Sequence, residues 1–157
     1  ITDQFSIQGS LGYTDAGFDE FLGFDADGVR GYDPVTDPAA AAALKFERVP
    51  ELTYNIMANY FQPLSNGAEI DFRLAYSYTD DFTNDALGTR AIITDSYGLL
   101  DASVSYTFAG SGLKLTVFGK NITDEDYHDF ALDNALTSLT WGGVPDTYGL
   151  RLTYSFE

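Results

Sequence analysis

The sequence predicts an all-β chain that folds as an antiparallel up-and-down meander of about six strands. Three observations predict this class. Apolar and polar residues alternate with a period of two in six separate stretches, which is typical of strands with one apolar face and one wet face. The connections between these stretches are alternately long and short. Every charged residue within the stretches falls on the polar side of the alternation.

The expected strands cover residues 4–13, about 50–61, 70–78, 100–108, 113–118 and 148–156. The third is the most regular, with Ile70, Phe72, Leu74, Tyr76 and Tyr78 alternating with Asp71, Arg73, Ala75 and Ser77. The last strand shows the same alternation from Tyr148 onward and ends in the spaced aromatic residues Tyr154 and Phe156. Each strand therefore has one continuous apolar side.

Two of the connections are predicted to be tight turns, at 63–67 and 109–112. The first contains Asn66-Gly67, a pair that supplies the positive φ angles that hairpins need. The other connections, 19–47, 80–94 and 123–143, are expected to be loops. The first of these is acidic and irregular, and its alanine run from Ala39 to Ala43 is long enough for one helical turn only.

Composition excludes several classes of protein. The net charge of −16 excludes a nucleic-acid partner, because such partners select basic surfaces. The absence of Cys excludes disulfides and thiolate metal sites. No apolar run approaches the roughly 20 residues of a transmembrane helix, which leaves a membrane β-barrel open. The chain starts at Ile1 rather than Met and shows no signal peptide, so we expect it to begin inside a longer protein.

Alternation alone fits a soluble β-sandwich as well as a membrane barrel. Aromatic residues lie near the strand ends while Leu, Val, Ile and Ala lie in the middle, as in an interfacial girdle, and this favours transmembrane strands. Six strands are too few to close a barrel, since the smallest single-chain barrels have about eight. We therefore expect part of a larger barrel. In it, Leu74, Val104 and Leu152 would face lipid, and Arg73, Asp101 and Arg151 would face the lumen.

Two segments near the end of the chain resemble a known family. Residues 119–127 read Gly-Lys-Asn-Ile-Thr-Asp-Glu-Asp-Tyr, and residues 145–156 run from Pro145 to Phe156 through the alternating strand. The pair resembles the closing hairpin of TonB-dependent receptors of the bacterial outer membrane, with G-x-N-L-x-D-x-x-Y before P-R-x-x-x-L-x-L-x-Y-x-F. Here Ile122 replaces the Leu, Asp146 replaces the Arg, and Glu157 follows the Phe that usually ends the chain.

The resemblance implies that residues 1–157 are the C-terminal part of such a barrel, without its plug domain. It also implies active import of a scarce nutrient such as a ferric siderophore, cobalamin or a glycan. The partners would be TonB, through the region before Ile1, the barrel-assembly machinery, the lipid bilayer and a small-molecule ligand. No enzymatic activity and no cofactor are expected. Two alternatives stay open: an outer-membrane barrel enzyme, and a soluble β-sheet binding module.

Candidate site residues follow from these readings. The last long loop contains four candidate ligand residues, Tyr127, His128, Phe130 and Trp141. Aromatic side chains in such a loop either pack against the protein or bind a ligand. His128 is the only histidine, so a barrel enzyme would have to use it, although no nucleophile is placed beside it in the sequence.

Two further pairs of residues are candidates. The stretch that contains Asp25 and Asp27 resembles the first ligand positions of a calcium-binding loop, but the remaining ligand positions are missing. In outer-membrane barrels, a terminal strand that ends like Tyr154 and Phe156 resembles an assembly signal, and these residues also fit an interfacial girdle.

Overall fold

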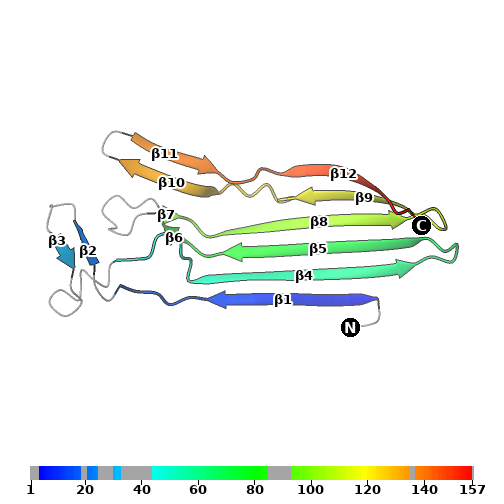
Figure 1. Ribbon diagram of the computed structural model, residues 1–157, viewed down its shortest axis with the longest axis horizontal. Coiled ribbons are helices and arrows are strands. Elements are labelled where there is room, and N and C mark those ends of the chain that lie inside the picture. The colour runs from blue at the N-terminus through cyan, green and yellow to red at the C-terminus, as the bar shows by residue number, and fades with distance from the viewer. Residues whose placement is uncertain are drawn as a thin grey trace.

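The protein forms one extended antiparallel sheet with smaller hairpins at one end, as shown by a computed structural model that describes residues 4–18, 21–24, 30–32, 44–84, 93–134 and 137–156 (Figure 1). The sheet consists of β1 (Phe5–Tyr13), β4 (Leu52–Pro63), β5 (Glu69–Thr79), β8 (Tyr97–Thr107), β9 (Leu113–Lys120) and β12 (Thr147–Tyr154), in that order. Neighbours in the sheet are also successive in the chain, and all pair antiparallel. The predicted six-stranded meander is confirmed.

The strand ends differ from the sequence prediction where a partner strand extends the pairing. β8 begins at Tyr97, three residues early, because Tyr97 still pairs with Thr79 of β5. β9 continues to Lys120, which pairs with Thr147. β12 ends at Tyr154 rather than at Phe156, since Tyr154 pairs with Leu113, the first residue of β9. Strand length is thus set by the neighbouring strand as well as by alternation.

The register places all the alternating apolar residues on one side of the sheet, which we call the apolar face. Leu74 lies opposite Ala58 and Ala102, and Leu152 lies opposite Leu115. The other side, the polar face, holds the charged residues of the strands. Its cross-strand partners include Arg73 with Ser103, Asp71 with Ser105, and Arg151 with Thr116. The division into two faces is as the sequence predicts.

No hydrophobic core covers the apolar face within the described residues. Leu74 is 48% exposed and Leu152 is 67% exposed, although both are surrounded by apolar neighbours on the sheet. The buried apolar side chains of the described residues, Leu44, Ala68, Phe82 and Ala131, all lie in the connections. A β-sandwich would bury this face against a second sheet. The uncovered face therefore argues against a soluble sandwich.

The short turns lie at one end of the sheet and the long connections at the other (Figure 1). Gly67 has a φ of 81°, as the Asn-Gly prediction requires. Asn66 instead contributes its side chain, whose Oδ1 accepts a hydrogen bond from the Ala68 N–H at 3.1 Å. In the second turn Gly110 and Gly112 both have positive φ, at 61° and 64°.

The long connections contain strands that the sequence analysis treated as loop, so that part of the prediction is wrong. They are β2 (Phe21–Phe24) with β3 (Arg30–Tyr32), β6 (Phe82–Thr83) with β7 (Ile93–Thr94), and β10 (His128–Asn134) with β11 (Thr137–Gly142). β2, β3, β6 and β7 have four residues or fewer, too few for an alternation to stand out, whereas the alternation in β10 and β11 was overlooked. The run Ala39–Ala43, together with Asp25, Asp27 and Glu157, lies outside the described residues. No helix of the described part is long and apolar enough to cross a membrane.

Candidate functional site

Asn121 organises the connection that follows β9. Its side chain is 2% exposed and its φ is 46°, a left-handed conformation that Asn tolerates better than most residues. Nδ2 donates to the carbonyl oxygens of Glu125 at 2.9 Å and Val144 at 3.1 Å. Oδ1 accepts a hydrogen bond from the Glu125 N–H at 2.9 Å. The Asn121 side chain therefore closes a turn with Glu125 at the start of the connection and links this turn to Val144 at the far end of the connection.

The same loop start is tied to β8. The Asn121 N–H donates to the Asp101 carboxylate at 3.0 Å, and the Ile122 N–H donates to the Leu100 carbonyl at 2.8 Å. These bonds give the β10–β11 hairpin a fixed base at the long-connection end of the sheet.

Tyr127, a predicted ligand residue, packs between the loop and the sheet. Its ring stacks on Tyr97, with centroids 4.2 Å apart and planes 20° apart. Its hydroxyl oxygen accepts a hydrogen bond from the Val144 N–H at 3.1 Å, and its carbonyl accepts one from the Gly143 N–H at 2.7 Å. A side chain at Gly143 would collide with this ring, so a glycine is needed there. The ring of Tyr127 contributes to loop packing in this arrangement.

Phe130 and Trp141, two more of the predicted residues, form a cluster with Arg48. They are cross-strand partners in β10 and β11, with ring centroids 5.3 Å apart. The Arg48 guanidinium lies 5.6 Å from the centre of the Phe130 ring and donates a hydrogen bond to the Asp129 carbonyl at 3.3 Å. Trp141 is 53% exposed. This Arg48 cluster combines an aromatic surface with a cation, which suits a ligand that has a flat or anionic part.

Arg48 was missed by the sequence analysis. It has a φ of 58°, and its N–H donates to the Thr83 carbonyl at 2.8 Å. Its guanidinium reaches the Asp129 carboxylate at 4.0 Å, so Arg48 joins three connections that are distant in sequence. Nothing in the local sequence signals this. The alternation of Phe130 with Leu132, and of Leu139 with Trp141, was the available signal for the hairpin that carries the cluster.

His128 begins β10 and is exposed. Its side chain makes no hydrogen bond and no ion pair with a described residue, so no triad is assembled around it there. In the described part of the chain, no group of His, Cys, Asp or Glu residues is arranged to hold a metal ion. The candidate calcium residues Asp25 and Asp27 lie outside that part.

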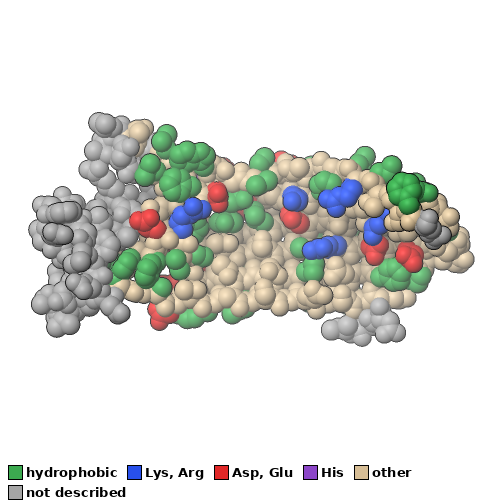
Figure 2. Space-filling view, viewed as in Figure 1, with side chains coloured by type: hydrophobic (Ala, Val, Ile, Leu, Met, Phe, Trp, Pro, Cys, Tyr) green, Lys and Arg blue, Asp and Glu red, His purple; other side chains and the backbone are tan. Residues whose placement is uncertain are grey.

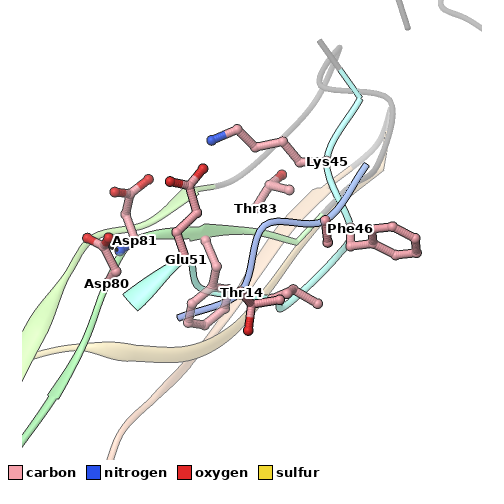
Figure 3. Close-up of a pocket in the computed structure, with 10 residues that line it drawn as sticks. Thr14, Lys45, Phe46, Glu51, Asp80, Asp81 and Thr83 are labelled. Atoms are coloured by element: carbon pink, nitrogen blue, oxygen red, sulfur yellow. Dashed lines mark hydrogen bonds between the residues drawn. The ribbon is translucent and has the colours of Figure 1, made fainter. Parts of the chain in front are cut away.

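A small hollow at the base of the long connections is lined by three carboxylates and one cation (Figure 3). Glu51, Asp80 and Asp81 line it together with Lys45. Asp80 is already engaged, since its Oδ1 accepts hydrogen bonds from the Tyr78 hydroxyl at 3.2 Å and the Asp81 N–H at 3.1 Å. The volume of the hollow is about 130 Å³, well below the roughly 300 Å³ of a small ligand pocket. We do not assign a ligand to it.

Comparison with known proteins decides between the membrane barrel and the soluble binding module. The family described as TonB dependent receptor-like, beta-barrel, matches residues 2–122, which is most of the chain. The chain belongs to this family of TonB-dependent receptors. No curated protein and no solved structure matches it. The family match includes β1, β4, β5, β8 and β9, and β12 pairs directly with β9, so the terminal strand continues the same receptor barrel.

Family membership places this receptor barrel in the bacterial outer membrane and implies an interaction with TonB. The soluble binding module is thereby excluded. The apolar face, which is free of charged residues in the six strands, is the face toward lipid, and the polar face lines the lumen. Since outer-membrane barrels have short periplasmic turns and long extracellular loops, the Arg48 cluster lies on the extracellular side. That Tyr127, His128, Phe130 and Trp141 contact a ligand stays a prediction.

Proposed function

We propose that the complete receptor imports a scarce small-molecule nutrient, of the class of ferric siderophores, cobalamin or glycans. The ligand binds to the extracellular loops and crosses the lumen with energy supplied through TonB. Residues 1–157 contribute the C-terminal barrel wall and three extracellular connections, and they carry out no bond chemistry. The barrel-assembly machinery inserts the protein, and the lipid bilayer surrounds the apolar face.

The observation that carries this proposal is the Arg48 cluster. The exposed Trp141 ring, packed on the half-buried Phe130 ring beside a guanidinium, provides contact area and a directed charge at little entropic cost, as is common in binding surfaces. The cluster stands on a hairpin whose base is held by the hydrogen bonds of Asn121 and the packing of Tyr127. A rigid base reduces the ordering cost of ligand binding.

An enzymatic function receives no support from the described residues. His128 is exposed, and no serine, carboxylate or carbonyl of that part forms a hydrogen bond with its side chain. Hydrolysis would need a base within hydrogen-bonding distance of a nucleophile. Transport is therefore the function that the site supports best.

Uptake measurements in the native host test the proposal. A deletion strain carrying the full-length receptor is supplied with ferric siderophores, cobalamin and glycans in turn, with and without TonB. We expect one class to enter in a TonB-dependent manner, and Phe130→Ala with Trp141→Ala to weaken its uptake at least tenfold. Tyr13→Ala is the matched control, because Tyr13 is an exposed aromatic residue on the apolar face. Receptor-independent uptake of every class would refute the proposal.

A further inference from the structure

The aromatic residues of the apolar face differ between its two ends. Toward the long connections, the aromatic residues that the six strands place on this face are all tyrosines, namely Tyr13, Tyr54, Tyr76, Tyr78 and Tyr148. Toward the short turns the same face also carries phenylalanines, among them Phe5 and Phe72. Aromatic belts lie at both surfaces of a membrane. Here the belt at the extracellular surface is the one in which every ring carries a hydroxyl group.

Three of these tyrosines form a connected group in the middle of the sheet, which we call the tyrosine shelf: Tyr54 of β4, and Tyr76 and Tyr78 of β5. The rings of Tyr54 and Tyr78 stack, with centroids 5.0 Å apart and planes 21° apart. The Tyr76 ring is 6.1 Å from the Tyr54 ring and tilted by 44°. Both β4 and β5 are paired on both sides. The exposure of the shelf on the lipid side therefore does not arise from an open edge of the sheet.

Gly98 of β8 leaves the space that the Tyr76 side chain occupies. A Cβ at residue 98 would collide with the ring and the hydroxyl group of Tyr76. The register places Tyr76 opposite Leu100 and Tyr78 opposite Gly98. To cover Gly98, the Tyr76 side chain must therefore lean along the sheet toward the extracellular end. This places its hydroxyl group near the level of the lipid headgroups.

The shelf lies where the apolar face meets the polar connections. Phe72 and Tyr78 are separated by six residues of β5, or about 20 Å, and the apolar band of an outer-membrane barrel is about 25 Å tall. Beyond the shelf, the Tyr78 hydroxyl donates a hydrogen bond to Oδ1 of Asp80 at 3.2 Å. The Asp81 N–H also donates to this oxygen, whereas Oδ2 of Asp80 accepts no hydrogen bond from the described residues. The rim of the shelf therefore has a free acceptor.

The strands place no cation beside the shelf. Their Lys and Arg residues lie on the polar face, where Figure 2 shows them over the main sheet (Figure 2). The apolar face of the six strands is free of charged residues. The strands therefore offer a lipid no charge that would hold its phosphate groups. The shelf offers ring faces, phenol hydroxyl groups and, at its rim, a carboxylate oxygen.

We propose that the tyrosine shelf binds the saccharide headgroup of a lipid in the outer leaflet. A sugar ring has apolar C–H groups on its faces, which pack on aromatic rings, and hydroxyl groups around its rim, which exchange hydrogen bonds with phenols and carboxylates. A phospholipid headgroup such as phosphoethanolamine has no such ring. The acyl chains of the same lipid lie along the apolar face, which continues from the shelf to Leu74. This inference concerns the lipid around the barrel and does not depend on the imported ligand.

Native mass spectrometry of the complete receptor tests the proposal with two lipids of equal acyl chains, digalactosyl diacylglycerol and phosphatidylethanolamine, supplied in equal amounts. We expect the receptor to retain the glycolipid about fivefold more than the phospholipid, the factor that one net hydrogen bond contributes. The triple variant Tyr54→Phe/Tyr76→Phe/Tyr78→Phe keeps the rings but loses the hydroxyl groups, so it should lose this preference. Tyr60→Phe is the matched control, because it removes an exposed hydroxyl group from the same face at the turn end.

Gly98→Ala provides a second variant, because it displaces the Tyr76 side chain without removing a tyrosine, and it should also reduce the preference. Heat-modifiability on gels shows which variants are folded, and the three single Phe variants replace the triple variant if it is not. Equal retention of both lipids by the unchanged receptor overturns the proposal, as does a preference that survives in the folded Phe variants or falls equally in Tyr60→Phe. Displacement of the glycolipid by the same concentration of free digalactose would indicate a site for a soluble sugar and would also overturn it.

Discussion

At the scale of single residues, Asn121 is the side chain on which the last extracellular connection depends. It makes three side-chain hydrogen bonds while 2% exposed, and no small apolar residue can replace them. We predict that Asn121→Ala lowers the free energy of unfolding of the complete barrel by about 2–4 kcal/mol, because three partly buried hydrogen bonds to the backbone of Glu125 and Val144 are lost. Equilibrium unfolding of the receptor from lipid vesicles measures this.

Two control variants separate the loss of the side-chain hydrogen bonds from the backbone strain at residue 121. Asn121→Gly also loses the side chain but accepts the φ of 46°, so it should be less destabilising than Asn121→Ala by about 1 kcal/mol. Asn66→Ala removes one hydrogen bond at an exposed turn and should cost less than either. If Asn121→Ala costs no more than Asn66→Ala, the central role of Asn121 is wrong.

At the scale of elements, β5 provides a direct test of the two faces. Leu74 and Ala75 are adjacent in the strand but lie on opposite faces. We predict that Leu74→Arg destabilises the complete barrel by about 2–4 kcal/mol, because a charge at mid-strand then faces hydrocarbon. Ala75→Arg places the same side chain in the lumen near Asp101 and should have a much smaller effect. Folding titrations into lipid vesicles compare the two, and an equal loss would contradict the assignment of the faces.

The strands of the main sheet were predictable from sequence because each repeats its alternation many times. β5 has eleven residues, and its register with both neighbours follows the pattern of Leu74, Tyr76 and Tyr78. The hairpins in the connections were not predictable in the same way. β6 and β7 have two residues each, and such short strands exist only because tertiary contacts hold them.

The candidate site was predictable in part for a related reason. Phe130 and Trp141 stand out as aromatic residues in a polar loop, and the structure makes them cross-strand partners. Arg48 is 81 residues before Asp129, and its left-handed backbone leaves no sequence signal. The charged residues of the strands fall on the predicted polar face, but which of them lie side by side appears only when the register aligns β5, β8, β9 and β12. Pairing between residues that are distant in the sequence is the feature that is hardest to predict from a single sequence.

At the scale of the whole molecule, the open sheet predicts how residues 1–157 behave alone. β1 and β12 are the edges of the described sheet, and each leaves one row of backbone groups unpaired. We predict that this segment, expressed by itself, associates or misfolds rather than forming a monomeric pore, since unpaired edges add further strands. Size-exclusion chromatography and gel mobility in detergent measure this. A cooperatively folded, heat-modifiable monomer would show that the edges are satisfied in some other way.

The aromatic residues Tyr154 and Phe156 belong to the same scale, because the role that we predict for them is in the assembly of the whole barrel. Tyr154 ends β12, and Phe156 lies beyond the strand and is 89% exposed, touching Tyr154 edge-on with ring centroids 4.7 Å apart. Phe156 therefore contributes little to the folded sheet. An exposed strand end with spaced aromatic residues can instead add to the sheet edge of a partner, where the backbone pairs and the rings fill pockets.

We predict that Phe156→Ala and Tyr154→Ala in the full-length receptor strongly reduce the amount of folded protein in the outer membrane of cells. Folding of the same variants into lipid vesicles should stay close to normal, because the lost contacts are few and exposed. Phe108→Ala is the control, since Phe108 is also a partly exposed aromatic residue at the short-turn end but is not terminal. Unchanged assembly in cells, or an equal loss in cells and vesicles, would leave these residues a role only in the interfacial girdle.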